Sequence, residues 1–258
     1  MQASQMTELQ AKTLNALLAW YEAMGVDEAI GDEPVNRFAP APARHESLRR
    51  PRTSPEAPAA KSTLASAVPA DAVSLRDLEE MVSAFEDCGL KRTAKSLCFA
   101  RGSESARLML IGEAPGRDED LQGKPFVGRA GQLLDRMLPA IGLVESQVYI
   151  TNTVYWRPPG NRTPTPQEVT ACAPFLCRQI ELLGPAVLVL LGRAAATNVL
   201  GVNEGIMRLR GKWLTYACAG RDIPTLATLH PAYLLRKPEE KRYAWRDLLM
   251  LKEAMDNL

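Results

Sequence analysis

Four short apolar runs lie along the chain after residue 73, and longer amphipathic stretches separate them. The runs are 107–111 (RLMLI), 148–154 (VYITNTV), 186–191 (AVLVLL) and 224–229 (PTLATL). Helical patterns lie between the first three runs, namely QLLDRMLPAI and EVTACAPFLCRQIELL. Alternation of strand and helix is typical of a parallel sheet that helices cover on both faces. The pattern therefore predicts an α/β fold, with a hairpin before the last strand that turns at 219–222.

The residues before this region follow a different pattern. Apolar side chains recur at helical spacing over 7–24, which predicts one amphipathic helix. Residues 33–72 are rich in Ala, Pro, Arg and Ser, which predicts an extended, disordered linker. Ser74 followed by Asp77 resembles the capping box that begins a helix. We therefore divide the chain into an N-terminal helical segment (1–32), a linker (33–72) and a folded domain (73–258).

The composition is that of a globular protein and narrows the function only a little. The 258 residues carry a net charge of +1, so bulk charge does not indicate a nucleic-acid binder. Lysine and arginine outnumber the acids between Gly205 and Arg246, which suits phosphate contact and a solvated surface equally well. Without a bilayer-length apolar run or a signal peptide, we expect a cytoplasmic protein that binds no membrane. Five cysteines with no C-x-x-C pair do not indicate a disulfide framework.

Ligands of open α/β sheets bind beyond the carboxyl ends of the strands, so the segments after the four runs are the places to look for chemistry. GEAPGRDEDLQGKPFVG follows the first run. Its glycines allow backbone to approach a ligand closely, but their spacing fits neither a Walker motif nor a dinucleotide fingerprint. Glu113 is more informative, because a carboxylate one residue past a buried strand is unfavourable to bury unless it has a task.

The second and fourth runs contribute an amide and an imidazole. Asn152 falls within the apolar run 148–154, and its side chain has the donors and acceptor that can read the lactam edge of a pyrimidine. The alternative is an Asn that bonds only neighbouring backbone. His230, one of two histidines, begins HPAYLLRKPEEKR, where apolar bulk stands next to cations. That combination suits a wedge into a base stack with phosphate contacts beside it, although a lone histidine is more often structural.

Together the four segments resemble the uracil-DNA glycosylase superfamily, and most of all its family 4. The resemblance covers residues 85–252 and rests on motifs in matching order: GEAPG (112–116), ED (119–120), G-x-PFVG (123–128), AGQLLD (130–135), TN (151–152), RPPGNR (157–162), LG (191–192) and HPAYLLR (230–236). It implies a three-layer α/β/α sandwich around a four-stranded parallel sheet. It also implies an enzyme of base excision repair that flips uracil out of DNA and hydrolyses its N-glycosidic bond, which leaves an abasic site and free uracil.

The resemblance further implies a role for each strand-end residue. Glu113 would act beside the sugar, and His230 would stabilise the negative charge that develops on uracil O2. The uracil would be bound by Ala114, Gly116, Phe126, Asn152 and His230. Phe126 would stack on the base, and Asn152 would read its polar edge. The DNA would be bound by Arg157, Asn161, Arg162, Leu234 and Arg236. Leu234 would fill the gap left by the flipped base, and we expect a monomer that binds single- or double-stranded uracil-containing DNA.

Family 4 enzymes typically carry an iron–sulfur cluster on four cysteines, and this chain matches two of the four positions. Cys88 and Cys172 match, whereas Phe85 and Trp156 stand in the other two places. Since a cluster needs about four protein ligands, we expect a protein without a cofactor or metal, in which the two thiols are small buried hydrophobes. The alternative is a cluster of different geometry that recruits Cys98, Cys177 and Cys218.

Two other functions remain open at this point. Gly116 stands where related enzymes place a bulkier residue that excludes the thymine methyl group, so the same fold could act on another deaminated base, hypoxanthine or xanthine. The second alternative is a non-catalytic damaged-DNA-binding module that kept the pocket and lost the chemistry. The joint presence of Glu113, Phe126, Asn152 and His230 argues against that module.

Overall fold

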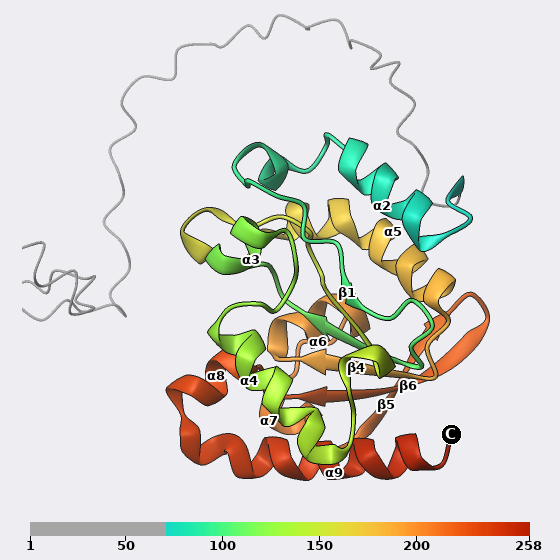
Figure 1. Ribbon diagram of the computed structural model, residues 1–258, viewed down its shortest axis with the longest axis vertical. Coiled ribbons are helices and arrows are strands. Elements are labelled where there is room, and N and C mark those ends of the chain that lie inside the picture. Colours follow the sequence, from blue (N-terminus) through green and yellow to red (C-terminus); the bar gives the residue numbers. More distant parts are fainter. Residues whose placement is uncertain (1–70) are drawn as a thin grey trace, which may run out of the picture. The chain divides into compact units, whose positions relative to one another are not determined.

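A computed structural model describes residues 71–258, which lie within one compact unit, 61–258. The predicted N-terminal helix over 7–24, and all but the last two residues of the predicted linker, lie outside the described residues. The division of the chain at 32 and 72 therefore stays a prediction. Within the described part, one sheet of six strands runs in the order β1-β3-β2-β4-β6-β5 (Figure 1).

The four predicted parallel strands form the centre of this sheet. They are β2 (Leu108–Gly112), β3 (Val148–Asn152), β4 (Val187–Leu191) and β6 (Arg221–Thr228). Two antiparallel edge strands extend the predicted count of four to six, namely β1 (Arg101–Gly102) and β5 (Trp213–Cys218). The predicted hairpin is confirmed, since β5 and β6 are joined at 219–220. The sequence pattern missed β1 because a two-residue strand has no periodicity of its own.

Helices cover both faces of the sheet, so the predicted three-layer α/β/α architecture is confirmed. Leu188 and Leu190 of β4 pack in one core with α2 (Leu75–Ala84), α5 (Pro166–Leu183), α6 (Arg193–Leu200) and α7 (Ile206–Leu209). Val187, Val189 and Leu191 face the other way and pack with α4 (Arg129–Met137) and α9 (Lys241–Asp256). Alternate residues of a strand point to opposite faces, which explains how one apolar run serves two cores. Figure 1 shows α2 and α5 on one side of the sheet and α4 and α9 on the other.

Short elements complete the described chain. The helices α3 (Arg117–Gln122) and α8 (Pro231–Arg236) follow β2 and β6 at the carboxyl edge of the sheet. Five 3-10 turns connect the other elements: η2 (Gly89–Arg92), η3 (Pro139–Ile141), η4 (Glu145–Gln147), η5 (Pro159–Asn161) and η6 (Pro238–Glu240). None of the helices within 71–258 combines the length and the apolar character that crossing a bilayer requires.

Local capping explains where the helices begin. Ser74 is the N-cap of α2, and its Oγ accepts a hydrogen bond from the Asp77 backbone N–H at 3.1 Å, as the sequence predicts. Thr165 and Glu168 form a full capping box at the start of α5. The loop that leads to α5 is thereby held at the carboxyl edge of the sheet, next to the ends of β2 and β3.

Candidate functional site

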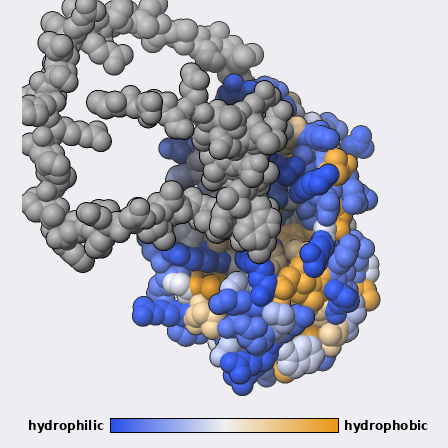
Figure 2. All heavy atoms as spheres, turned by 90° about the vertical axis from the view of Figure 1, so that its left-hand side faces the viewer, coloured by the Kyte–Doolittle hydropathy of each residue, from blue (hydrophilic) through white to orange (hydrophobic). Residues whose placement is uncertain are grey.

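A cavity of about 440 Å³ opens at the carboxyl edge of the parallel strands. Its walls come from three of the strand-end segments: Glu113, Ala114, Pro115, Gly116, Glu119, Phe126, Ala130, Asn152, Pro158, Asn161, Arg162, Thr163, His230, Ala232, Tyr233 and Arg236. The volume lies in the range of small-ligand sites. Figure 2 looks onto the side of the molecule where α3, α4 and α8 lie in Figure 1; on the visible part of the described chain, hydrophilic residues predominate and apolar ones form small patches.

The cavity brings together most of the residues that the sequence singles out. All the predicted catalytic and base-binding residues line it: Glu113, Ala114, Gly116, Phe126, Asn152 and His230. Three of the predicted DNA-binding residues line it as well, namely Asn161, Arg162 and Arg236. Arg157 and Leu234 do not. The strand-end argument therefore located one common site, although the side chains come from positions far apart in the sequence.

Asn152 is the most unusual of these side chains. It ends β3 in register with Gly112 of β2 and is 1% exposed. Among the described residues, neither its Oδ1 nor its Nδ2 has a hydrogen-bond partner. A buried amide left without partners is unfavourable by about 1–3 kcal/mol per group, and native proteins rarely keep one without a reason. The two polar groups of the amide are therefore available to a ligand in the cavity.

Gly112 makes room for this arrangement. A Cβ on Gly112 would overlap Asn152 Oδ1 and would lie 2.5 Å from Cζ of the Phe126 ring. Any other residue at this position would push the amide and the ring out of place. The glycine that ends β2 is thus required by the pocket and not by a turn.

Phe126 forms another wall of the cavity with a strained backbone. Its φ of 56° is unusual for a residue other than glycine and is unfavourable by about 1–3 kcal/mol. A Cβ on Gly131 would overlap the Phe126 carbonyl, so the absence of a side chain there permits the conformation. The Phe126 ring is buried, and its centroid lies 5.6 Å from that of His230. Strain of this kind at a cavity wall is typical of a functional site.

His230 is held in one tautomer by the helix that it begins. It is the N-cap of α8, and its Nδ1 accepts a hydrogen bond from the Ala232 backbone N–H at 3.1 Å. Burial, and then the charge of Arg236, lower the pKa of His230 to about 4. The imidazole is therefore neutral at pH 7 with its proton on Nε2, which makes it a hydrogen-bond donor. Gly192 lets the ring sit here, because its own Cβ would lie 2.9 Å from that of His230.

Glu113 follows β2 directly and is half-buried on the cavity wall. Burial raises the pKa of its carboxyl group, and a hydrogen bond with the Thr163 side chain opposes that rise. Its backbone is also fixed, since Thr153 Oγ1 donates to the Glu113 carbonyl at 2.8 Å. The sequence analysis missed Thr163, because nothing in the loop RPPGNRTPTP indicates which of its side chains turns toward Glu113.

Glu119 braces the loop that forms this wall. Its Oε2 accepts from the Gly116 backbone N–H at 3.1 Å, and its Oε1 accepts from the Gly128 N–H at 2.8 Å. One buried carboxylate thereby ties together the two ends of the loop from 116 to 128. The neighbouring carboxylate of Asp120 accepts from the Lys95 N–H at 2.7 Å and joins the same loop to the segment before β1.

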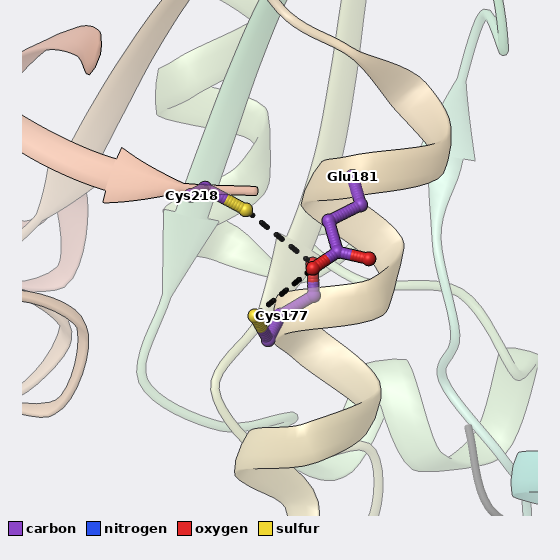
Figure 3. A group of neighbouring side chains, drawn as sticks. All are labelled: Cys177, Glu181 and Cys218. Carbon is purple, nitrogen blue, oxygen red and sulfur yellow. Dashed lines mark hydrogen bonds between the residues drawn. The ribbon is translucent and has the colours of Figure 1, made fainter. Parts of the chain in front are cut away.

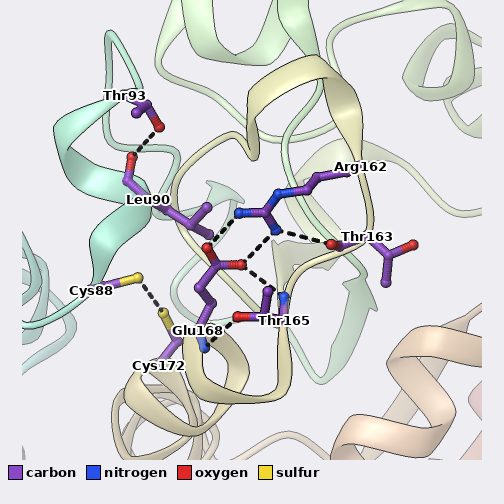
Figure 4. A network of polar contacts seen from close by, with 8 residues as sticks. All are labelled: Cys88, Leu90, Thr93, Arg162, Thr163, Thr165, Glu168 and Cys172. Atoms are coloured by element: carbon purple, nitrogen blue, oxygen red, sulfur yellow. Dashed lines mark hydrogen bonds and ion pairs between the residues drawn. The ribbon is translucent and has the colours of Figure 1, made fainter. Parts of the chain in front are cut away.

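The predicted DNA-contact arginines have different surroundings. Arg162 makes a bidentate ion pair with Glu168, with N–O distances of 2.8 and 2.7 Å (Figure 4), and this pairing lowers the pKa of Glu168 to about 2. Arg157 donates to Asn161 Oδ1 at 2.8 Å. Arg236 is exposed on the rim, and within the described chain it has no ion pair closer than 4 Å.

Leu234 lies inside the protein rather than on the rim. It is 1% exposed and packs with Leu133, Leu229 and Ala244. Its neighbour Tyr233 is half-buried and lines the cavity. The role of Leu234 as the wedge that replaces a flipped base stays a prediction, and this packing would have to open for it.

A second cavity of about 560 Å³ adjoins the first. It shares Glu113, Thr163, His230, Tyr233 and Arg236 with the first cavity, and its further wall includes Arg193. The two cavities therefore form one continuous depression along the carboxyl edge of the sheet.

The thiols of Cys88 and Cys172 form a pair away from the cavity. The Sγ atoms of Cys88 and Cys172 are 3.9 Å apart and buried (Figure 4). The aromatic residues at the two other family positions pack nearby: the Phe85 ring lies 4.8 Å from that of Phe175, and Trp156 is buried in the same core. The described residues at these four positions supply two thiols, so the four-cysteine cluster of family 4 does not fit here.

Comparison with known proteins identifies a family and several type-4 enzymes among the relatives of this chain. The profile of the Uracil DNA glycosylase superfamily matches residues 99–249. A type-4 uracil-DNA glycosylase of Archaeoglobus fulgidus is 42% identical over 64% of this chain and 85% of its own. The type-4 uracil-DNA glycosylase of Thermotoga maritima is 41% identical over 62% of this chain and 82% of its own. The type-4 uracil-DNA glycosylase of Saccharolobus solfataricus is 40% identical over 67% of this chain and 82% of its own.

These findings correct the expectation of a protein without a cofactor or metal, which is wrong. The relatives are named type-4 enzymes, the class that the resemblance associates with an iron–sulfur cluster. The structure also brings Cys177, Glu181 and Cys218 together, with ligand atoms within 4.8 Å of one another, in a group that could hold a metal ion. The expectation rested on the four motif positions and kept Cys98, Cys177 and Cys218 only as the ligands of an alternative cluster. Cys177 and Cys218 are 41 residues apart and meet only through the packing of α5 against β5.

Proposed function

Since this chain belongs to the uracil-DNA glycosylase superfamily, we propose that the strand-end cavity receives a uracil flipped out of DNA and that Glu113 and His230 carry its hydrolysis. Uracil-DNA glycosylase activity is named for each relative described above, and it is the function of this chain. The observation that carries the assignment to this cavity is the buried, unpartnered amide of Asn152.

Recognition of uracil follows from the chemistry of that amide. Uracil presents an N3–H donor next to its O4 acceptor, and the Asn152 side chain offers Oδ1 to the first and Nδ2–H to the second. Cytosine exchanges the two, so its N3 would face Oδ1 and its amino group would face Nδ2–H. Both polar groups of the amide would then stay buried and unpaired, which disfavours cytosine by several kcal/mol. Phe126 stacks on the base and fixes its plane.

His230 acts on the opposite edge of the base. When the N1–C1′ bond breaks, its electron pair passes into the uracil ring and negative charge develops on O2. A neutral imidazole with its proton on Nε2 donates a hydrogen bond to that oxygen, and such a preorganised donor contributes roughly 3–4 kcal/mol. The Ala232 N–H holds Nδ1 as the acceptor, so the donor is in place before the reaction begins.

Glu113 acts at the sugar. The C1′ atom becomes oxocarbenium-like as the uracil anion leaves, and the Glu113 carboxylate stabilises that positive charge. Water then adds to C1′, and its proton passes to the carboxylate, whose pKa is raised by burial. The products are an abasic sugar bearing a new C1′ hydroxyl and free uracil, which takes up a proton.

The remainder of the proposal concerns the DNA. The joined cavities provide a track for the strand on either side of the flipped nucleotide, and Arg236 is the rim cation placed to meet a phosphate. Arg157, Asn161 and Arg162 stay as proposed strand contacts. We further propose that the protein acts as a monomer in the cytoplasm, on single- or double-stranded DNA, and releases uracil.

The direct test is excision from an oligonucleotide with one uracil, compared between wild type and Asn152→Asp. The carboxylate keeps the size of the amide but cannot donate to O4, so single-turnover excision should fall by at least about 10³-fold. Asn203→Asp, at an exposed position, is the matched control and should keep the wild-type rate. Undiminished excision by Asn152→Asp would remove Asn152 from the recognition role.

A further inference from the structure

Three metal-ligating side chains converge where α5 meets β5, away from the uracil cavity (Figure 3). Cys177 and Glu181 lie one turn apart on α5, and Cys218 ends β5. Cys218 pairs with Arg221, at the start of β6, whereas the cavity lies beyond the other end of β6. We propose that Cys177, Glu181 and Cys218 bind one zinc-like divalent ion, which fastens the β5–β6 hairpin to α5.

The separations between the ligand atoms suit a tetrahedral ion. Cys177 Sγ lies 3.7 Å from Glu181 Oε1, and all three ligand atoms lie within 4.8 Å of one another. Zinc–sulfur bonds of about 2.3 Å and zinc–oxygen bonds of about 2.0 Å place sulfur and oxygen roughly 3.5 Å apart in a tetrahedral site. The Cys177 Sγ to Glu181 Oε1 distance is already close to this value. Small side-chain movements would bring Cys218 Sγ to a similar distance from both atoms.

The fold explains why these three side chains meet. Residues four apart on a helix share a face, which brings the Cys177 thiol and the Glu181 carboxylate together. The same face of α5 packs against β5, whose last residue is Cys218. Cys218 is 6% exposed, while Cys177 and Glu181 are half-buried. The group is therefore covered on one side and open on the other, which leaves the fourth coordination position to water.

Neighbouring groups orient the ligands and balance their charge. Arg178 binds Glu181 Oε2 at 2.8 Å, which turns Oε1 toward Cys177. The Tyr216 hydroxyl hydrogen-bonds with Cys177. Two thiolates and a carboxylate would carry three negative charges, and a divalent ion with the nearby Arg178 and Arg221 would offset them. Such outer contacts are a regular part of metal sites.

The ligand set also selects the kind of metal. Two thiolates with one carboxylate favour zinc over magnesium or calcium, which prefer oxygen ligands only. An iron–sulfur cluster would need about four ligands, usually thiolates, and this group supplies two. Since the site lies at the amino edge of the parallel strands, the ion would stabilise the fold without touching the bond that is cleaved.

The test uses the full chain, purified with a reductant, stripped by a chelator and titrated with cobalt(II). We expect one cobalt ion per chain, a thiolate-to-cobalt charge-transfer band, and displacement by zinc. Cys177→Ser and Cys218→Ser should each weaken cobalt binding at least about 100-fold. Glu181→Gln should keep the band and weaken binding about tenfold, and it remains informative if a cysteine variant fails to fold.

A second readout is thermal unfolding. Zinc at about 100 times its dissociation constant should raise the wild-type Tm by roughly 5–10 °C and leave the Tm of Cys177→Ser unchanged. The matched control is the Cys88→Ser, Cys172→Ser double variant, which removes the other thiol pair and should bind cobalt like the wild type. The proposal is overturned if the wild type binds no cobalt, or if the band survives in Cys177→Ser and Cys218→Ser and is lost in the control.

Discussion

Asn152 and Gln179 are two buried carboxamides with opposite surroundings. Gln179, on α5, is fully buried: its Nε2 donates to Tyr149 at 2.9 Å and its Oε1 accepts from Tyr155 at 3.1 Å. Asn152, at the end of β3, is equally buried and has no partner among the described residues. The same functional group is thus paired within the core in one place and left available to a ligand in the other. Burial alone does not separate the two roles, whereas the hydrogen-bond partners do.

The largest effect is expected from replacing each amide by leucine, which has a similar size. Asn152→Leu should lower single-turnover uracil excision by at least about 10³-fold and leave the Tm unchanged or raised, because it removes an unpaired polar group. Gln179→Leu should do the reverse, since it leaves two tyrosine hydroxyls unpaired and lowers the free energy of unfolding by about 2–4 kcal/mol. Excision assays and thermal unfolding of both variants measure this. Equal loss of excision in Asn152→Leu and Gln179→Leu would contradict the proposed difference between the two amides.

The next effect concerns the two titrating residues of the site. In the proposed mechanism Glu113 works as a carboxylate. Because burial raises the pKa of this group, excision should be lost as the pH falls through that raised pKa. His230 works in its neutral form with a pKa of about 4, so its own loss comes at lower pH. Glu113→Gln should reduce excision by about 10²-fold or more. It should also abolish the loss of excision that occurs at the higher pH, which is the one assigned to Glu113.

The measurement is the pH dependence of kcat/KM for the wild type and Glu113→Gln, on an oligonucleotide with one uracil. A control for acid damage is full recovery of activity after return to neutral pH. An acid limb that stays at the same pH in Glu113→Gln would assign that limb to another group.

A smaller effect is expected from the two hydrogen bonds by which Glu119 joins the ends of the loop from 116 to 128. In Glu119→Gln only one side-chain oxygen remains to accept the two hydrogen bonds from Gly116 and Gly128, so the loop should loosen. We expect about a tenfold fall in kcat/KM, mainly through KM, with a Tm lower by a few degrees. Asp118→Asn, at an exposed neighbouring position, should behave like the wild type. A change in kcat alone would point to a direct role of Glu119 in bond cleavage.

The smallest effect should separate two rim arginines. Arg236 has no ion pair among the described residues, whereas Arg162 is paired with Glu168. Arg236→Ala should weaken DNA binding a few-fold and reduce the slope of log K against log salt by about one. Arg162→Ala should change that slope less, because its charge is already engaged. Fluorescence anisotropy over a salt series measures both, and equal slopes would show that the ion pair opens on DNA.

The main elements of this protein and its candidate site residues follow from local patterns in the sequence. The four parallel strands come from short apolar runs, and the start of α2 comes from Ser74 and its cap. Glu113, Asn152 and His230 could be singled out because a polar side chain at the end of a buried strand must face a ligand or find a partner. Parallel strands end at one edge, so these residues had to meet.

Contacts between distant segments could not be read in this way. The sequence does not show that Thr163 bonds Glu113, that Arg162 is engaged by Glu168, or that Leu234 is buried under α4 and α9. It also led to the wrong expectation about the cofactor, because Cys177 and Cys218 become neighbours only when α5 packs on the hairpin.

The sequence by itself determined the kind of fold and the polar residues that meet at one edge of the sheet, because strand period, caps and motif order are properties of short segments. Only the tertiary structure decided which polar groups are paired and which are left for a ligand. Asn152 and Gln179 are both amides within apolar surroundings, and their difference lies in partners that come from other parts of the chain. Pairing depends on distances between segments, which no local pattern contains.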